Sequence, residues 1–218
     1  MQSSQLIAQY PQIYHMAEVN SWPTIQSWGL LSTSAALDRF NIRGPERVQL
    51  EMKHRPDRVE LKDPEKHTLV LRDQKPMFPT RLQDALPPDI TPSDWYSLIN
   101  GKVFFWAEEH RLERLLNARQ YRNFEHDVLT ICTRSLIEEY EQQIWLCHMN
   151  SGNTFPMPHA RDRTIFSRLA DYPTKRDGRP KKEVVEVTVD YAVPNVLRHT
   201  LQVRRMHGRE VKAILWQR

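Results

Sequence analysis

The 218-residue sequence contains only two cysteines, no apolar run of membrane length and no export signal. Cys132 and Cys147 each end an apolar run, which is typical of buried thiols in strands, and nothing else suggests a compartment that favours a disulfide. The first residues lack the basic and apolar stretches of a secretory signal, and crossing a bilayer requires about 20 predominantly apolar residues. We therefore expect a cytoplasmic protein without a membrane partner.

The signatures of several enzyme classes are missing as well. The nine histidines and two cysteines include no His-x-x-x-His or Cys-x-x-Cys pair, so we expect no metal site. The absence of a Gly-x-Ser-x-Gly elbow argues against an α/β-hydrolase type of serine nucleophile. The absence of both Gly-x-Gly-x-x-Gly and a P-loop argues against a Rossmann or P-loop nucleotide site.

The charges that are present are unevenly distributed. Residues 1–160 hold 17 Lys/Arg against 20 Asp/Glu, whereas residues 161–218 hold 14 against 7. A basic C-terminal quarter is typical of contact with an anion, which here would be a nucleic-acid backbone, the pyrophosphate of a cofactor or an acidic partner. A solvated basic surface explains the same pattern, and the sequence does not choose between these explanations.

The pattern of apolar residues predicts an α+β fold built on antiparallel sheets, in a single domain that spans residues 1–218. Helical spacing and N-cap residues predict helices over 3–10, 22–28, 35–40, 95–98, 107–120 and 134–142. Apolar or alternating runs predict strands over 13–16, 103–106, 127–133, 144–147, 183–189, 197–205 and 210–216. Residues 41–94 are expected to form short strands joined by turns, and residues 150–182 a long polar excursion.

Three short motifs combine ligand-binding groups with residues that ordinary folding also explains. His15 ends the strand 13–16 and precedes the hydroxyl cluster 32–34, and such groups can bind a ribose or a carboxamide, although a histidine at a strand end is more often a satisfied core residue. The aromatic run 103–106 is typical of a core strand, but a ring at its end can stack on a nicotinamide. The polar turn 149–154 has the composition of an ordinary turn and also places amides and hydroxyls on a loop.

Glu186 is the most informative residue of the sequence. Side chains alternate along a strand, so Glu183 and Glu186 point to opposite faces of the strand 183–189, and Val185 and Val187 enclose Glu186. A carboxylate between valines costs free energy unless it has a partner or a function. A salt-bridged or edge-strand glutamate is the structural alternative.

Taken together, these motifs resemble the ADP-ribosyltransferase fold, and in particular the DarT-type toxins that modify nucleic acid. The matching blocks stand in the same order along the chain: Tyr14-His15, Asn20-Ser21-Trp22-Pro23, Gly29-Leu30, Phe104-Phe105, and Glu186 followed by Val193-Pro194. The chain departs from the toxin pattern where Glu108 replaces an arginine, so Arg111, Arg72 or another arginine would have to take its role. Nearly the whole chain also resembles a bacterial family of unknown function, through the blocks 71–76, 103–106 and 150–154.

The transferase resemblance implies split antiparallel β-sheets with peripheral helices, NAD as the substrate, and residues 41–94 as an insertion without a counterpart. It implies that Glu186 is the catalytic residue, which holds the 2′-hydroxyl of the nicotinamide ribose and stabilises the oxocarbenium-like transition state. The other contacts to NAD would come from His15, Met16, Ser32, Ser34, Phe105, Trp106 and Arg111.

The resemblance also implies a target site, because these folds place their target-recognising loop before the strand of the catalytic glutamate. The basic residues of this segment suit a phosphate backbone: Arg161, Arg163, Lys175, Arg176, Lys181 and Lys182. RNA or DNA is therefore the expected target, in a toxin–antitoxin or phage-defence setting with an antitoxin as partner. The alternatives are a non-catalytic basic module that binds nucleic acid or protein, and an NAD or nucleotide hydrolase on the same scaffold.

Overall fold

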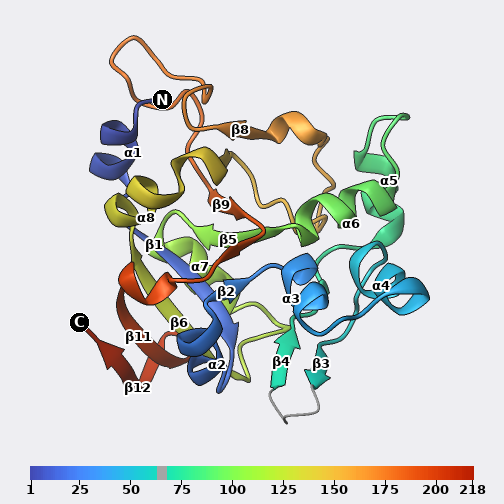
Figure 1. The fold of residues 1–218 in the computed structure, drawn as a ribbon. Coiled ribbons are helices and arrows are strands. Elements are labelled where there is room, and N and C mark those ends of the chain that lie inside the picture. The colour runs from blue at the N-terminus through green and yellow to red at the C-terminus, as the bar shows by residue number, and fades with distance from the viewer. Residues whose placement is uncertain (63–67) are drawn as a thin grey trace.

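The computed structural model describes residues 1–62 and 68–218, and its centre is one antiparallel sheet (Figure 1). The order of the strands across this sheet is β12-β11-β6-β1-β5-β9-β7-β8. Their bounds are β1 (Gln12–Glu18), β5 (Lys102–Trp106), β6 (Glu125–Cys132), β7 (Ile144–Cys147), β8 (Phe166–Arg168), β9 (Glu186–Asp190), β11 (Thr200–His207) and β12 (Glu210–Gln217). Every pairing is antiparallel, which confirms the α+β class predicted from the sequence.

The sheet is split between β1 and β5. Strand β1 pairs with β6 over its whole length, but it meets β5 at a single register pair, Tyr14 with Trp106. Next to that pair, the Nδ1 atom of His15 lies 2.8 Å from the carbonyl oxygen of Phe104, so an imidazole takes the place of a backbone donor. The two halves of the sheet therefore diverge beyond Tyr14, as the resemblance to split-sheet transferases implied.

Helices and two small sheets surround the central sheet (Figure 1). The helices are α1 (Ser3–Gln9), α2 (Trp22–Trp28), α3 (Thr33–Arg39), α4 (Gly44–Glu51), α5 (Pro79–Ala85), α6 (Pro92–Asn100), α7 (Glu109–Leu116) and α8 (Thr133–Tyr140), with 3-10 turns at Glu141–Gln143, Arg163–Ile165 and Val196–Arg198. The small sheets pair β2 (Leu30–Leu31) with β10 (Ala192–Val193) and β3 (Val59–Lys62) with β4 (Thr68–Leu71). The main core lies between the central sheet and α1, α2 and α8.

Three predictions about secondary structure need correction. Residues 41–94 contain the expected short strands, β3 and β4, which pair with each other, but they also contain α4 and α5; residues 63–67 lie outside the described residues. Both helices have a proline in the first turn, where the missing N–H removes no helical hydrogen bond. The strand predicted over 183–189 begins only at Glu186, and the helix predicted over 107–120 is confined to Glu109–Leu116.

Within the described ranges, no helix is long and apolar enough to cross a membrane. The same residues contain no cluster of three or more His, Cys, Asp or Glu side chains that could hold a metal ion. Both cysteines are free thiols, with Cys147 buried in β7 and Cys132 at the end of β6.

Candidate active-site cavity

A cavity of about 540 Å³, called the central cavity below, opens where β1 and β5 diverge. This volume is in the range of ordinary small-molecule sites. Its walls come from segments far apart in the sequence: residues 15–21 of β1 and its following turn, 29–33, 68–74, 99–106, 150–152 and Glu186. The opening of the sheet therefore brings the predicted catalytic glutamate and the Tyr-His strand to the same hollow.

Glu186 is the first residue of β9, between β5 and β7, so it is not on an edge strand. Only 4% of its surface is exposed, and no Lys, Arg or His of the described residues forms an ion pair with it. Its two carboxylate oxygens share the backbone N–H of Ser151, at 3.2 and 3.3 Å. The Ser151 side chain also hydrogen-bonds this carboxylate. A carboxylate has about four lone-pair positions, so the donors of this one residue leave acceptor capacity facing the central cavity.

Burial raises the pKa of Glu186 from 4.5 to about 7, because removal from water penalises the charged form. The Ser151 hydrogen bonds and the nearby positive charge of Arg161 oppose this rise but do not cancel it. The salt-bridge and edge-strand explanations of the sequence pattern therefore do not apply. A buried carboxylate with a shifted pKa in a cavity is instead typical of a functional group.

Arg161 supports this arrangement rather than contacting a target. The side chain is 3% exposed, and its guanidinium donates to the carbonyl oxygens of Ser151 and Asn153 at 2.9 and 2.8 Å. The peptide of Ser151 is thus held between the carboxylate of Glu186 and the guanidinium of Arg161. This burial and these hydrogen bonds do not favour the predicted contact of Arg161 with a nucleic-acid backbone.

His15 lines the central cavity as predicted, and its chemistry follows from its environment. Burial, with a contribution from Arg72, lowers the pKa of the imidazole to about 4, so the ring is neutral at pH 7. A carbonyl oxygen can only accept, so the contact with Phe104 assigns the proton to Nδ1. Nε2 is then an acceptor, which suits a ligand hydroxyl.

The aromatic strand separates into a core ring and two rings nearer the cavity. Phe105 also lines the central cavity, but it is 1% exposed and belongs to the main core, with its ring centroid 5.8 Å from that of His15. Trp106 and Phe104 are half-buried and line the central cavity on the other face of β5. Trp106 is also the register partner of Glu186. A stacking role for Phe105 does not fit its burial, whereas Trp106 stays a candidate.

Of the four remaining residues predicted to bind the cofactor, two line the central cavity and two do not. Met16 and Ser32 line it; the carbonyl oxygen of Met16 accepts from Arg72, and the Ser32 hydroxyl caps α3 by accepting from the N–H of Ala35. Ser34 does not line it, because its hydroxyl donates to Glu51 and to the carbonyl oxygen of Asn100. Arg111 does not line it either.

Arg111 is occupied at the surface. It forms ion pairs with Glu108 at 3.0 Å and with Glu183 at 2.7 Å. Helix α7 places Arg111 next to these two carboxylates and not among the residues that line the central cavity, which does not favour the predicted contact with a cofactor. The sequence showed that this arginine is displaced from its position in the toxin pattern, but it did not show that Glu108 and Glu183 are its ion-pair partners.

The other predicted nucleic-acid contacts are exposed but do not surround the cavity: Arg163, Lys175, Arg176, Lys181 and Lys182. Lys175 and Arg176 line a separate surface hollow together with Met1, Gln2, Ser3 and Gln5 at the start of the chain. Their contact with nucleic acid stays a prediction.

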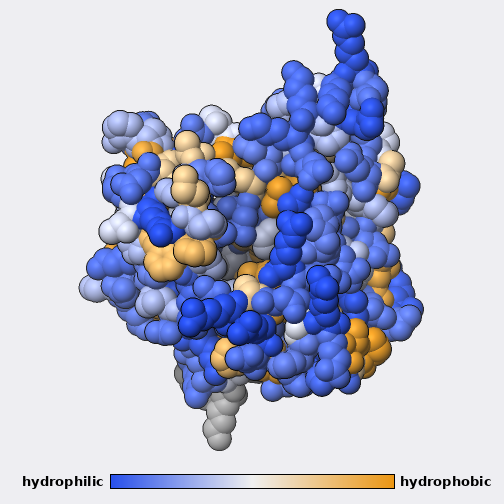
Figure 2. Space-filling view, turned by 180° about the vertical axis from the view of Figure 1, so that it is seen from behind, coloured by the Kyte–Doolittle hydropathy of each residue, from blue (hydrophilic) through white to orange (hydrophobic). Residues whose placement is uncertain are grey.

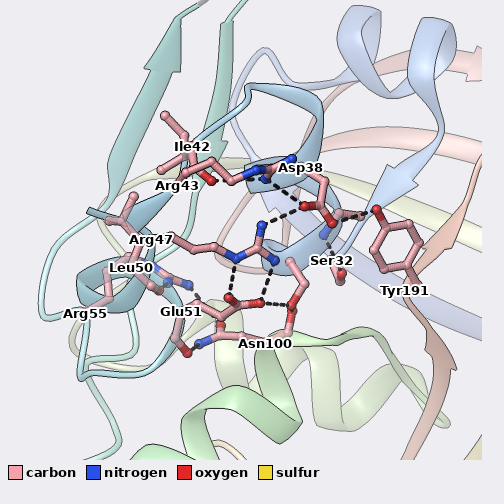
Figure 3. A network of polar contacts seen from close by, with 12 residues as sticks. Ser32, Asp38, Ile42, Arg43, Arg47, Leu50, Glu51, Arg55, Asn100 and Tyr191 are labelled. Carbon is pink, nitrogen blue, oxygen red and sulfur yellow. Dashed lines mark hydrogen bonds and ion pairs between the residues drawn. The ribbon is translucent and has the colours of Figure 1, made fainter. Parts of the chain in front are cut away.

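Arg55 lines the central cavity, although it was not among the residues predicted for the site. It lies in a stretch of charged residues of the kind that usually forms an exposed surface. Figure 3 shows it beside a network that joins α3, α4 and α6. In this network Arg47 pairs with Asp38 at 2.6 Å and with Glu51 at 2.7 Å, and Asn100 donates to the carbonyl oxygen of Glu51. The network fixes the wall of the central cavity to which Arg55 and Asn100 both belong.

Among solved structures the chain is similar to Thermosipho africanus DarTG in complex with ADP-ribose, with 13% identity and a TM-score of 0.43. The match covers 89% of this chain and 43% of that chain, so this chain spans less than half the length of the matched one. A likeness at this identity and TM-score says nothing about activity. No curated protein sequence matches the chain.

The family comparison covers most of the chain. The model described as "Family of unknown function (DUF7002)" matches residues 11–200, which include every wall of the central cavity. The chain therefore belongs to this family of unknown function, DUF7002.

Proposed function

We propose that this protein is an NAD-dependent ADP-ribosyltransferase whose reaction takes place in the central cavity. The observation that carries this proposal is Glu186, a buried carboxylate without an ion-pair partner among the described residues, at the point where the sheet opens. Such a group is suited to stabilise positive charge that develops on a bound sugar.

The proposed chemistry needs only groups that line the cavity. The bond between C1′ of the ribose and the nicotinamide nitrogen breaks, and the nicotinamide leaves with the electron pair. Glu186 accepts a hydrogen bond from the 2′-hydroxyl and stabilises the oxocarbenium-like ribose. An acceptor nitrogen or oxygen then bonds to C1′ and loses a proton, which Glu186 or water accepts. His15 Nε2 would accept from another ribose hydroxyl, and Trp106 would contact the nicotinamide.

The acceptor in this proposal is a base of single-stranded nucleic acid. Beside the cavity lies a group of side chains that we call the aromatic platform: the exposed Phe78 and Phe155 and the half-buried Arg81. The two phenylalanine rings are 6.2 Å apart, and the guanidinium of Arg81 lies 5.5 and 5.1 Å from their centroids. Figure 2 shows apolar residues gathered on the side of the molecule where α5 lies. Bases stack on aromatic rings and arginine planes without requiring a particular sequence.

The platform is connected to the catalytic loop by a short piece of chain. Phe155 follows the cavity residue Gly152 by three positions, a span of at most about 11 Å in an extended chain. Phe78 follows the cavity residue Pro76 by two positions, and its N–H donates to the Thr154 hydroxyl at 2.9 Å. A base on the platform is therefore within reach of the cavity through one flanking nucleotide.

Replacement of Phe155 by alanine is expected to weaken the binding of a single-stranded oligonucleotide about tenfold, because a stacked base contributes roughly 1–3 kcal/mol. Phe155 is 56% exposed, so the substitution leaves the core intact. Fluorescence anisotropy with labelled DNA and RNA measures the effect. Phe124→Ala is the matched control, since Phe124 is 54% exposed outside the platform. Equal affinities for all three proteins would show that the platform has another partner.

The rate of transfer is expected to rise with pH through about 7. Glu186 must be ionised to stabilise a cationic sugar, and burial holds its pKa near 7, so only about one molecule in ten is ionised at pH 6. The single-turnover rate should therefore be about tenfold lower at pH 6 than on the plateau above pH 8. A rate that is constant across this interval contradicts ionisation of Glu186 as the limiting requirement.

The function is tested with labelled NAD offered to the purified protein together with single-stranded DNA, RNA or a cell lysate. Label on nucleic acid supports the proposal, and free ADP-ribose alone identifies an NAD hydrolase. A toxin that an antitoxin partner restrains is the setting we propose, in which expression of the wild-type protein arrests growth and expression of a Glu186→Gln variant does not. Absence of both NAD cleavage and NAD binding would leave the non-catalytic binding module.

A further inference from the structure

Arg55 is a buried cation that lacks a carboxylate partner among the described residues. Only 6% of its surface is exposed, and it lines the central cavity. Its Nε and one terminal nitrogen donate to the carbonyl oxygens of Arg72 and Leu50 at 2.8 and 2.6 Å. The other terminal nitrogen approaches only neutral oxygens, those of Thr33 and Asn100. Neutral acceptors satisfy its donors but leave its charge uncompensated.

A second arginine of the same wall has free donor capacity. Arg72 lines the central cavity, and one terminal nitrogen donates to the carbonyl oxygen of Met16 at 3.1 Å. Its guanidinium lies 5.1 Å from the centroid of the Tyr121 ring. Its Nε is buried and has no hydrogen-bond partner. Because Arg55 holds the carbonyl group of Arg72, the two side chains are fixed relative to each other.

The carboxylates around the cavity do not neutralise this pair by direct contact. Glu18 forms an ion pair with Arg58 at 2.8 Å, and Glu60 lies near Lys62 on the β3 strand. Asp73 accepts from the Tyr121 hydroxyl and from the N–H of Lys75, and its charge reaches Arg55 only at longer range. Lys102 is paired with Asp190, so it adds no free charge. Among the described residues that line the cavity, two arginines and the carboxylate of Glu186 therefore have no ion-pair partner.

This distribution of charge indicates which kind of ligand would bind in the central cavity. A buried cation without a counter-ion is costly, and burial lowers the pKa of Arg55 to about 10. An anion that enters the cavity would provide the missing charge and would meet the second terminal nitrogen of Arg72, which has no hydrogen-bond partner among the described residues and is not among the buried unpartnered atoms.

We propose that Arg72, positioned by Arg55, forms a subsite for the diphosphate of a dinucleotide in the central cavity. This inference rests on the proposed function, which it deepens by assigning the two ends of NAD: the diphosphate to the arginines, and the cationic nicotinamide riboside to Glu186. Arg72 and Arg55 both come from residues 41–94, the segment without a counterpart in the toxin pattern. Arg72 thus takes the place that Arg111 leaves vacant.

The test measures binding without any reaction, by titration calorimetry with inorganic pyrophosphate, ADP, ADP-ribose and adenosine. Arg72→Gln is expected to weaken ADP-ribose and ADP at least tenfold and to leave adenosine unchanged, because charge-assisted hydrogen bonds to phosphate are lost. Arg111→Gln is the matched control and should bind all four compounds as the wild type does. Arg55→Lys keeps the charge but not the bond geometry, and should weaken the same phosphate compounds as Arg72→Gln.

Two results would overturn the subsite: wild-type protein that binds neither pyrophosphate nor ADP at millimolar concentration, or an Arg72→Gln variant that binds ADP-ribose as tightly as wild type. A loss of affinity for adenosine as large as that for ADP would also overturn it, since a folding defect would then explain both. A different result is expected if the subsite exists but the protein is not a transferase. Pyrophosphate and ADP would still bind through Arg72, but no label from NAD would reach any acceptor.

Discussion

Replacement of Glu186 by glutamine is expected to lower the rate of ADP-ribosyl transfer about 10³-fold, the range found when a preorganised electrostatic group is removed from an active site. Glutamine has the same shape, and its amide oxygen can still accept the N–H of Ser151. The substitution therefore removes the charge while it keeps the loop in place. The measurement is the single-turnover rate with labelled NAD and the preferred acceptor at pH 8, where the wild-type carboxylate is ionised.

Stability provides the control for this experiment. The folded-state pKa of Glu186, about 7, lies above its unfolded value of 4.5, so ionisation disfavours the folded state and the wild type loses stability as the pH rises from about 4.5 to 7. The Glu186→Gln protein lacks this loss. Its free energy of unfolding at pH 8 should exceed that of the wild type by between about 1 and 3 kcal/mol, and the two should converge near pH 4. An inactive variant that is also less stable would indicate misfolding, whereas a stable variant with full activity would refute the catalytic role.

Replacement of Gly29 by alanine is expected to lower the free energy of unfolding by about 4 kcal/mol, from backbone strain and overpacking together. Gly29 ends α2 with φ 77° and ψ −169°, a conformation that side chains rarely allow. A Cβ atom there would lie 2.3 Å from the carbonyl oxygen of Val193 and 2.4 Å from the Cα atom of Pro194. Urea denaturation measures the change.

Gly101→Ala is the matched control for this substitution. Gly101 also ends a helix, α6, but its φ is −81° and the nearest atom to an added Cβ is 3.5 Å away. We expect its free energy of unfolding to change by less than about 1 kcal/mol. Because Gly29 and Leu30 line the central cavity beside the β2–β10 pair, Gly29→Ala should also weaken ADP-ribose binding. Similar stabilities for the two variants would mean that β10 does not pack closely on Gly29.

Some features of the site were readable from the sequence because they depend on local patterns. A glutamate flanked by valines in an apolar run was either a salt-bridged or edge-strand residue or a functional one, and Glu186 proved to be buried on an inner strand without an ion-pair partner among the described residues. The Tyr14-His15 strand, the aromatic strand 102–106 and the polar turn around Ser151 were each recognisable by composition, and the fold brings residues of all three to one cavity. The antiparallel α+β class followed from strand periodicity in the same way.

Other features depend on which distant groups become neighbours, and no local pattern reports that. Arg161 and Arg163 look alike in the sequence, yet the first is buried against the carbonyl groups of its own loop and the second is exposed. Arg55 stands in a charged stretch that resembles a surface, and only the packing of α4 on α3 and α6 buries it. Arg111 was predicted in the cofactor site because of its position after the aromatic strand, but two carboxylates hold it at the surface.

The sequence by itself therefore determined the fold class, the strand that carries the catalytic candidate and the residue types available to it, because these follow from periodicity and from the free energy of placing a carboxylate among apolar side chains. Only the tertiary structure decided which arginines keep an uncompensated charge. The charge on each guanidinium depends for its compensation on the distance to carboxylates that are remote in the sequence. Burial adds to the effect, because electrostatic interactions are stronger in the low-dielectric interior than in water. For this reason Arg72 and Arg55, and not Arg111, face the cavity that Glu186 shares.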